Sequence, residues 1–422
     1  MYVLQYCSLG ETEDSIHTWN DKGIALGKLE RHEEAIACFE EAIRLDPENP
    51  KAWWNIGITF VQQGKYEEVV ACFDKIIKFD PKISSSWNNK GTALLRLERY
   101  EEALSCFEEA IRLDPEYSVA WNNKGSSLAS LGRHEEALSC FEEAIRLDPE
   151  YSVAWYNKAI ALGELERHEE AIACYEEAIK WDPEYSDAWY NKGSSLASLE
   201  RYEEAIACYD EAIRLDPENS APRGNKGMAL DELEKYAEAI ACYEEVIKGE
   251  PENPKAWHNK GIALALLRKY EEAIACFDEA IKWEPEDSVV WDGKGLVLCE
   301  LEKYAEAIVC YEEAIRLYPE YSSSWRGKGI ALCELEKYAE AIQCCDEAIK
   351  WEPEHTDAWY NKALALGELE RYEEALSCYD EAIKLYPEYL LALYGKGNSL
   401  RKLGRDEEAE QCLAKARELQ QC

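Results

Sequence analysis

The fold of this chain can be derived from one stretch of 34 residues, Ser152 to Tyr185, which reads SVAWYNKAIALGELERHEEAIACYEEAIKWDPEY. Within it, Trp155, Ala159 and Leu162 recur at the spacing of one helical face. This apolar stripe predicts a first helix over 154–165.

A second apolar stripe follows after a break at 166–167. Ala171, Cys174 and Ala178 share one helical face, which predicts a second helix over 168–181. Pro183 comes directly after it, and proline cannot continue a helix. The stretch therefore predicts two helices whose small facing residues let them approach closely.

The same pattern recurs twelve times along the chain with a period of 34 residues. Tryptophan and proline mark the period, at Trp19, Trp53, Trp87, Trp121, Trp155, Trp189, Trp257, Trp291, Trp325 and Trp359, and at Pro47, Pro81, Pro115, Pro149, Pro183, Pro217, Pro251, Pro285, Pro319, Pro353 and Pro387. A fixed period of this length is typical of a solenoid, in which each unit buries its apolar face against its neighbours.

These residues resemble the tetratricopeptide repeat, which carries Trp, Gly, Tyr, Ala, a large aromatic residue, Ala and Pro at fixed offsets. The resemblance covers residues 16–422 and implies an all-α, right-handed α-solenoid superhelix of twelve 34-residue helix-turn-helix units. Residues 1–15 are then an N-terminal segment that precedes the repeats. We expect a weak unit at 220–253, because Pro222, Arg223 and Gly224 stand where tryptophan recurs.

The chain departs from the family pattern at one position. Eleven units carry lysine where the family has leucine before its glycine, for example Lys90 and Lys124. We expect the stem of this lysine to pack on the repeat while its ammonium group reaches neighbouring carboxylates. A lysine row with a binding role is the alternative.

Charge limits the classes of partner. The chain has 86 acidic and 47 basic residues and a formal net charge of −39. Nucleic acids and anionic membranes are bound through Lys and Arg, so both are disfavoured as partners, and a basic protein or peptide is favoured. The first residues lack a basic segment and a long apolar run, and no stretch is long and apolar enough to span a membrane, so we expect a soluble, cytoplasmic protein.

Cysteine is unusually frequent, with seventeen residues in the chain. Twelve of them occupy one position of the repeat, at Cys38, Cys72, Cys106, Cys140, Cys174, Cys208, Cys242, Cys276, Cys310, Cys344, Cys378 and Cys412. Stacked helices are roughly 8–10 Å apart, which is too far for a disulfide, so we expect buried free thiols. A thiol-rich metal-binding or redox-responsive protein is the alternative function, with Cys299, Cys333 and Cys345 as its best candidates.

The family resemblance implies that the first helices line a concave groove. Counting from the first residue of each repeat, as from Ser152, positions 2, 5, 6, 9, 12 and 13 share the face away from the tryptophan. Position 6 is asparagine in seven consecutive units, at Asn55, Asn89, Asn123, Asn157, Asn191, Asn225 and Asn259. Because an amide both donates and accepts, this asparagine ladder could hold the backbone of an extended peptide. The alternative is that these amides bond only within the stack.

Position 5 carries aromatic residues, of which Trp54, Tyr156 and Tyr190 are candidates to hold partner side chains. They could instead cover neighbouring helices. The carboxylate clamp of chaperone-binding family members is absent, because position 5 is never lysine and position 6 is never arginine. The chain also lacks a phosphate loop, a nucleophile motif and paired metal-ligand motifs. We therefore predict a non-catalytic scaffold without cofactor or metal, binding a basic peptide in its groove.

Overall fold

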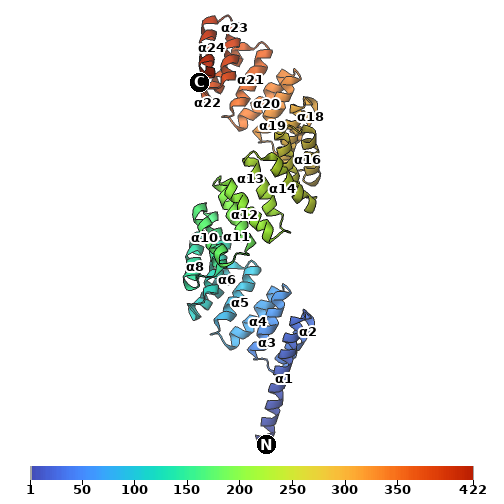
Figure 1. Ribbon diagram of the computed structural model, residues 1–422, viewed down its shortest axis with the longest axis vertical. Helices are drawn as coiled ribbons and strands as arrows, with labels where there is room; N and C mark the ends of the chain where they lie inside the picture. Colours follow the sequence, from blue (N-terminus) through green and yellow to red (C-terminus); the bar gives the residue numbers. More distant parts are fainter. Residues whose placement is uncertain (1, 422) are drawn as a thin grey trace. The chain divides into compact units, whose positions relative to one another are not determined.

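The structure is a computed structural model that describes residues 2–421, with side chains described for 15–420. Its 24 helices follow one another without a strand over 2–421, and each of the twelve predicted repeats forms one pair (Figure 1). The chain divides into two compact units, Met1–Pro217 and Glu218–Cys422. The predicted α-solenoid of helix pairs is confirmed, and each unit is a stack of six pairs.

The first unit holds twelve helices in chain order. They are α1 (Tyr2–Lys28), α2 (His32–Leu45), α3 (Pro50–Gln62), α4 (Tyr66–Phe79), α5 (Ser84–Arg96), α6 (Tyr100–Leu113), α7 (Ser118–Ser130), α8 (His134–Leu147), α9 (Ser152–Glu164), α10 (His168–Trp181), α11 (Ser186–Ser198) and α12 (Tyr202–Leu215). Helix α1 starts at Tyr2, so the backbone of the predicted pre-repeat segment continues directly into the first repeat.

The second unit repeats the arrangement. Its helices are α13 (Ala221–Glu232), α14 (Tyr236–Gly249), α15 (Pro254–Leu266), α16 (Tyr270–Trp283), α17 (Ser288–Glu300), α18 (Tyr304–Leu317), α19 (Ser322–Glu334), α20 (Tyr338–Trp351), α21 (Thr356–Glu368), α22 (Tyr372–Leu385), α23 (Leu390–Lys402) and α24 (Asp406–Gln421). The pair α13 and α14 forms although it lacks the tryptophan, and the expected weakness of this repeat stays a prediction.

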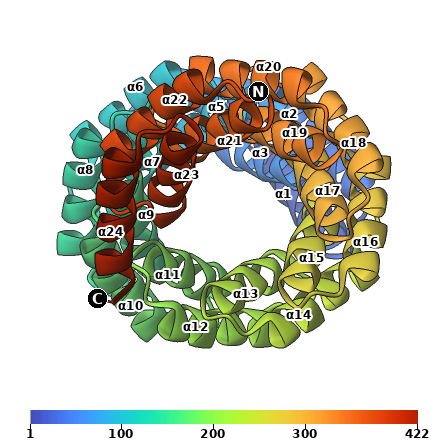
Figure 2. The ribbon, with the colours of Figure 1, turned by 90° about the horizontal axis from the view of Figure 1, so that it is seen from above.

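Each unit has an inner and an outer face. In both units, odd-numbered helices of neighbouring repeats contact each other, for example α7 with α9 and α17 with α19. Over residues 2–421, no pair of even-numbered helices makes a contact of comparable extent. Within each unit the odd-numbered helices therefore line the inner side of the curve and the even-numbered helices the outer side (Figure 2).

A tight turn joins the two helices of each repeat. In nine repeats it places a residue other than glycine in the left-handed region, such as Glu166 at φ +58°. Gly64, Gly132 and Gly404 hold the equivalent place at φ +71° to +74°. The turn thus requires a backbone conformation that costs an L residue about 1–2 kcal/mol.

In most repeats the two helices pack closely through a glycine on the first and an aromatic ring on the second. A Cβ atom added to Gly125 would lie 2.6 Å from Cε1 of Phe141, so the ring occupies the space that the glycine leaves. Phe141 is 1 % exposed, and Ala137 and Ala144 beside it are fully buried. The core of a repeat is therefore one aromatic ring enclosed by small residues.

In nine repeats a tryptophan links the repeat to the loop before it. Trp155 Nε1 donates a hydrogen bond to the carbonyl oxygen of Pro149 at 3.0 Å, and the same bond is made from Trp53, Trp87, Trp121, Trp189, Trp257, Trp291, Trp325 and Trp359. The two residues that define the period in the sequence are thus hydrogen-bonded partners.

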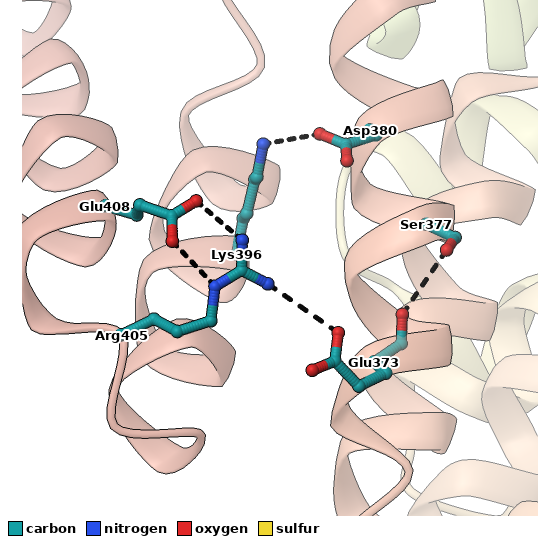
Figure 3. Close-up of polar contacts among 6 residues, drawn as sticks. All are labelled: Glu373, Ser377, Asp380, Lys396, Arg405 and Glu408. Carbon is teal, nitrogen blue, oxygen red and sulfur yellow. Dashed lines mark hydrogen bonds and ion pairs between the residues drawn. The ribbon is translucent and has the colours of Figure 1, made fainter.

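The lysine row behaves as predicted. Lys158 Nζ lies 3.0 Å from a carboxylate oxygen of Glu142, on the second helix of the preceding repeat. Lys396 makes the equivalent pair with Asp380, and Arg405 of the same repeat reaches Glu373 at 3.7 Å (Figure 3). In other repeats the lysine also lies over the tryptophan ring of its own repeat, 5.8 Å from the ring centroid for Lys124, Lys260 and Lys294. These residues hold repeats together and are not free for a partner.

Candidate peptide-binding surface

All ten residues predicted to bind a peptide lie on odd-numbered helices and are half-buried. Eight belong to the first unit, as Trp54 and Asn55 on α3, Asn89 on α5, Asn123 on α7, Tyr156 and Asn157 on α9, and Tyr190 and Asn191 on α11. Asn225 on α13 and Asn259 on α15 belong to the second unit. The first unit thus carries the larger part of the ladder on its inner face.

Several ladder amides donate within the stack. Asn123 Nδ2 donates to Oδ1 of Asn88 at 3.0 Å, and Asn157 Nδ2 donates to Oδ1 of Asn122 at 2.9 Å. Asn191 Nδ2 donates to the hydroxyl of Tyr156 at 3.0 Å. Each of these bonds joins neighbouring first helices, so part of the hydrogen-bonding capacity of the ladder stabilises the stack itself.

The acceptor capacity of the ladder is less fully used. The second amide hydrogen of Asn191 is directed to the carbonyl oxygen of Asp187 at 2.9 Å, which uses both donors of this side chain. Within residues 15–420, Oδ1 of Asn157 and Oδ1 of Asn191 accept no hydrogen bond. These two oxygens are the groups that can receive the N–H of a bound peptide.

The predicted aromatic anchors pack on the core ring of their own repeat. The Trp54 ring lies edge-on to Phe73 with centroids 5.3 Å apart. Tyr156 lies 6.0 Å from Tyr175 and 4.7 Å from Tyr185. Covering neighbouring side chains is thus one role of these aromatics.

A pocket of about 300 Å³ opens beside Tyr156, between α9 and α11. Its lining residues are Tyr156, Ile160, Gly163, Glu164, His168, Tyr175, Asn191, Ser194, Ser195 and Ser198. Tyr156 and Asn191 were predicted from the sequence to bind, and here they line the same cavity. The volume is at the lower end of the range for ligand sites, which suits one side chain of a partner.

The charges around this pocket favour a cation. Glu164 is exposed at its edge, and burial raises the pKa of Tyr156 to about 12, so the phenol stays protonated at neutral pH. Of the two tyrosines in the lining, Tyr175 is a core residue at 3% exposure, so Tyr156 and Glu164 are the aromatic and the acidic group that the pocket presents.

Comparison with known proteins establishes the family. A sequence model described as tetratricopeptide repeat matches residues 88–152, 156–220, 225–287 and 293–358. The chain belongs to the tetratricopeptide repeat family. Further models of tetratricopeptide repeats match 23–64, 50–83, 356–389 and 390–421 of the protein. No curated protein sequence is matched.

Solved structures resemble this tetratricopeptide repeat protein over different lengths. Yeast Tom70 is 17% identical, with 94% of this chain and 96% of that chain covered and a TM-score of 0.43. A chain of the Cut9–Hcn1 hetero-tetramer of the APC/C is 14% identical, with 96% of this chain and 93% of that chain covered and a TM-score of 0.49. YrrB, a TPR protein with an unusual peptide-binding site, is 25% identical, with 44% and 97% covered and a TM-score of 0.39.

The thiols of this tetratricopeptide repeat protein are core residues. The cysteines described are all free, and of the twelve at the repeated position only Cys242 and Cys412 are half-buried, the others being buried. Burial raises the pKa of Cys72 to about 12, and of Cys276 and Cys310 to about 11. Because the thiolate is the nucleophile and metal ligand, raised pKa values disfavour the alternative of a metal-binding or redox protein. Within the described residues, no three His, Cys, Asp or Glu side chains converge as metal ligands.

Apart from Tyr156 and Asn191, the residues that line the pocket were not predicted as binding residues, Glu164 and His168 among them. Glu164 occupies position 13 of its repeat, a groove-facing position, so its helical spacing was a sufficient signal. His168 starts the second helix, and only the packing of α9 against α10 brings it to the cavity.

None of the helices over 2–421 is long and apolar enough to cross a membrane.

Proposed function

We propose that this protein is a non-catalytic scaffold that binds an extended, basic segment of a partner protein on the inner face of its first unit. The observation that carries the proposal is the pocket between α9 and α11, whose lining brings Tyr156 and the exposed carboxylate of Glu164 beside Asn191.

The peptide backbone is held by the ladder carbonyls. Oδ1 of Asn157 and Oδ1 of Asn191 accept N–H groups from the peptide, while their own amides remain bonded to neighbouring repeats. This role is independent of peptide sequence, since every residue except proline carries a backbone N–H. Specificity then comes from the pocket, which takes a lysine or arginine.

The net charge supports the same class of partner. A charge of −39 attracts basic segments over the screening length of the solution and raises their association rate. Ile58 and Ile160, at 38% and 36% exposure, add apolar contact on the same helices. The inner face of the first unit thus offers three things to a bound peptide: acceptors for its backbone N–H groups, a site for a cationic side chain, and apolar surface.

The test uses a fluorescein-labelled peptide of about ten residues in which alanine and lysine alternate, and its counterpart with glutamine for lysine. We expect the lysine peptide to bind more tightly than the glutamine peptide, and the difference to shrink at high salt. Glu164→Gln should weaken lysine-peptide binding by a few-fold, the range of an exposed ion pair. Glu166→Gln, two residues further along in the turn, is the matched control and should leave binding unchanged.

The ladder is tested separately. Because each hydrogen bond to a peptide contributes only about 0.5–1.5 kcal/mol, a single Asn→Ala change should be mild. Replacing Asn89, Asn123, Asn157 and Asn191 together should weaken binding more than tenfold while the circular dichroism of the protein stays helical. Equal affinity for both peptides, or undiminished affinity in the fourfold variant, would show that the inner face of the first unit is not the binding surface.

A further inference from the structure

The inner face of the second unit carries a row of aliphatic side chains. Position 9 of five successive first helices holds Met228, Ile262, Leu296, Ile330 and Leu364, on α13, α15, α17, α19 and α21. Met228 and Leu296 are more than half exposed, and Ile262 and Leu364 are 39% and 38% exposed. The same position in the first unit is interrupted by a threonine and two serines. An uninterrupted apolar row on a water-facing surface indicates a contact surface for a partner.

The asparagine ladder stops in the middle of this row. Gly293 and Gly327 stand at the ladder position, and Asp292 and Arg326 stand where aromatic residues occur in other repeats. A Cβ atom at position 327 would lie 2.5 Å from Cζ of Tyr311, so glycine is needed for this ring to lie where it does. The inner surface between α17 and α19 therefore carries glycine and charged residues at the two positions where the pocket of the first unit carries aromatic residues and asparagine.

A cavity of about 270 Å³ lies at this place. It is lined by Asp292, Leu296, Cys299, Glu300, Tyr311, Ser323, Arg326, Gly327 and Ile330. Two residues of the aliphatic row, Leu296 and Ile330, form part of its wall. The cavity thus interrupts the apolar row with a polar centre.

Arg326 lies close enough to Asp292 in this cavity for its charge to oppose the rise that burial causes in the pKa of that carboxyl, but no hydrogen bond joins the two side chains. Nε of Arg326 is buried without a hydrogen bond, and the guanidinium makes no ion pair within residues 15–420. By contrast, Arg316 on the outer helix of the preceding repeat lies 2.5 Å from Glu313. An unpaired buried donor is costly, and a guanidinium prefers the two oxygens of a carboxylate.

The Asp292 carboxylate accepts its hydrogen bonds from two serines and none from Arg326. Ser324 Oγ donates to Oδ1 of Asp292 at 2.6 Å, and Ser323 Oγ donates to Oδ2 at 3.4 Å. The Arg326 donors therefore remain available to a ligand that enters the cavity.

We propose that this cavity binds the carboxylate of an internal aspartate or glutamate of a second partner segment, whose aliphatic neighbours cover the row at position 9. The acidic residue lies within the partner segment and not at its C-terminus, because the aliphatic row continues on both sides of the cavity. Met228 and Ile262 precede the cavity, and Leu364 follows it. A singly charged carboxylate fits better than a doubly charged phosphate, since Asp292 and Glu300 also line the cavity and repel anions. This surface is independent of the basic-peptide surface proposed for the first unit.

The test uses fluorescein-labelled peptides of about nine residues, amidated at the C-terminus, with one glutamate between leucines and flanking serines for solubility. A second peptide has glutamine in place of glutamate, a third has glutamine and a free C-terminal carboxylate, and a fourth has phosphoserine. We expect the glutamate peptide to bind at least tenfold more tightly than the glutamine peptide, the range of a charge-assisted hydrogen bond. Arg326→Gln should abolish this difference, and Arg316→Gln, the matched control, should preserve it.

Asp292→Asn should change the affinity for the glutamate peptide in the opposite direction to Arg326→Gln. Removing a like charge from the cavity should tighten binding of the glutamate peptide by a few-fold, while circular dichroism of each variant confirms that it is folded. Equal binding of the glutamate and glutamine peptides would overturn the proposal, as would a glutamate preference that survives Arg326→Gln. Tighter binding of the phosphoserine or free-carboxylate peptide would overturn it too, as would weaker binding after Asp292→Asn.

Discussion

Replacing the left-handed glutamates of the turns by glycine should stabilise the protein. Glu98, Glu166 and Glu200 have φ values of +58° to +59° and join the two helices of three repeats in the first unit. Their side chains are exposed, and their carboxylates make no hydrogen bond or ion pair within residues 15–420. The side chain can therefore be removed without loss of a native contact.

The expected gain follows from two opposing contributions. An L residue in the left-handed region costs about 1–2 kcal/mol, and glycine removes that cost. Glycine also makes the unfolded chain more flexible, which costs about 0.5–1 kcal/mol. The net gain is about 0–1.5 kcal/mol at each turn, and at the middle of these ranges about 2 kcal/mol for the three separated changes together.

Urea unfolding followed by circular dichroism measures this gain as a higher midpoint of the triple variant. Two control variants test whether relief of backbone strain causes the higher midpoint. Gly132→Glu introduces the same strain at a position with φ +74° and should lower the midpoint. Glu150→Gly, at an exposed turn residue without positive φ, should lower the midpoint slightly because only the unfolded state changes. If the triple variant were no more stable than the parent, strain in these turns would not limit stability.

Three further outcomes are expected. Trp155→Phe removes the bond to the preceding loop and should cost about 0.5–1.5 kcal/mol, measured as faster amide exchange in that repeat than in its neighbours. Gly125→Val drives a branched side chain into Phe141 and should cost about 1–3 kcal/mol in urea unfolding, whereas Gly367→Ala, with open space around its Cβ, should not destabilise. Cys72 has its pKa raised to about 12, so above about pH 9 the unfolded thiol loses its proton while the folded one keeps it. The free energy of unfolding should therefore fall between pH 9 and 11, and it should fall less steeply in Cys72→Ala. Between pH 7 and 8 the thiol is protonated in both states, so its titration should not change the urea midpoint.

The period of the sequence is sufficient to predict the helix pairs, because each element is determined by residues close to it in the chain. The second helix of the fifth repeat, 168–181, was predicted with the bounds that the structure has, since Pro183 ends it by a local steric effect. The first helix begins at Ser152, two residues earlier than predicted, because its apolar stripe marks the buried face and not the first turn. Helix α1 was missed before residue 16, where the repeat pattern gives no signal.

The candidate site was only partly predictable. Helical spacing placed Tyr156 and Asn191 on the inner face, but not in a common pocket, which requires the distance between α9 and α11. The direction of the asparagine amides also depends on a residue 35 positions away, as for Asn157 and Asn122. The left-handed backbone of the turns could not be predicted from the sequence, because most of these positions are glutamate. Residue type indicates a positive φ only where the position is glycine.

The hydrogen bond that joins a tryptophan to the loop before it in nine repeats has a consequence for biosynthesis. It joins residues six positions apart, and the asparagine bonds between repeats join residues 35 apart. A repeat emerging from the ribosome therefore finds its docking partner among residues that left the exit tunnel just before it. The chain can fold vectorially, adding one helix pair to a stack that already exists, without waiting for its C-terminus to be translated.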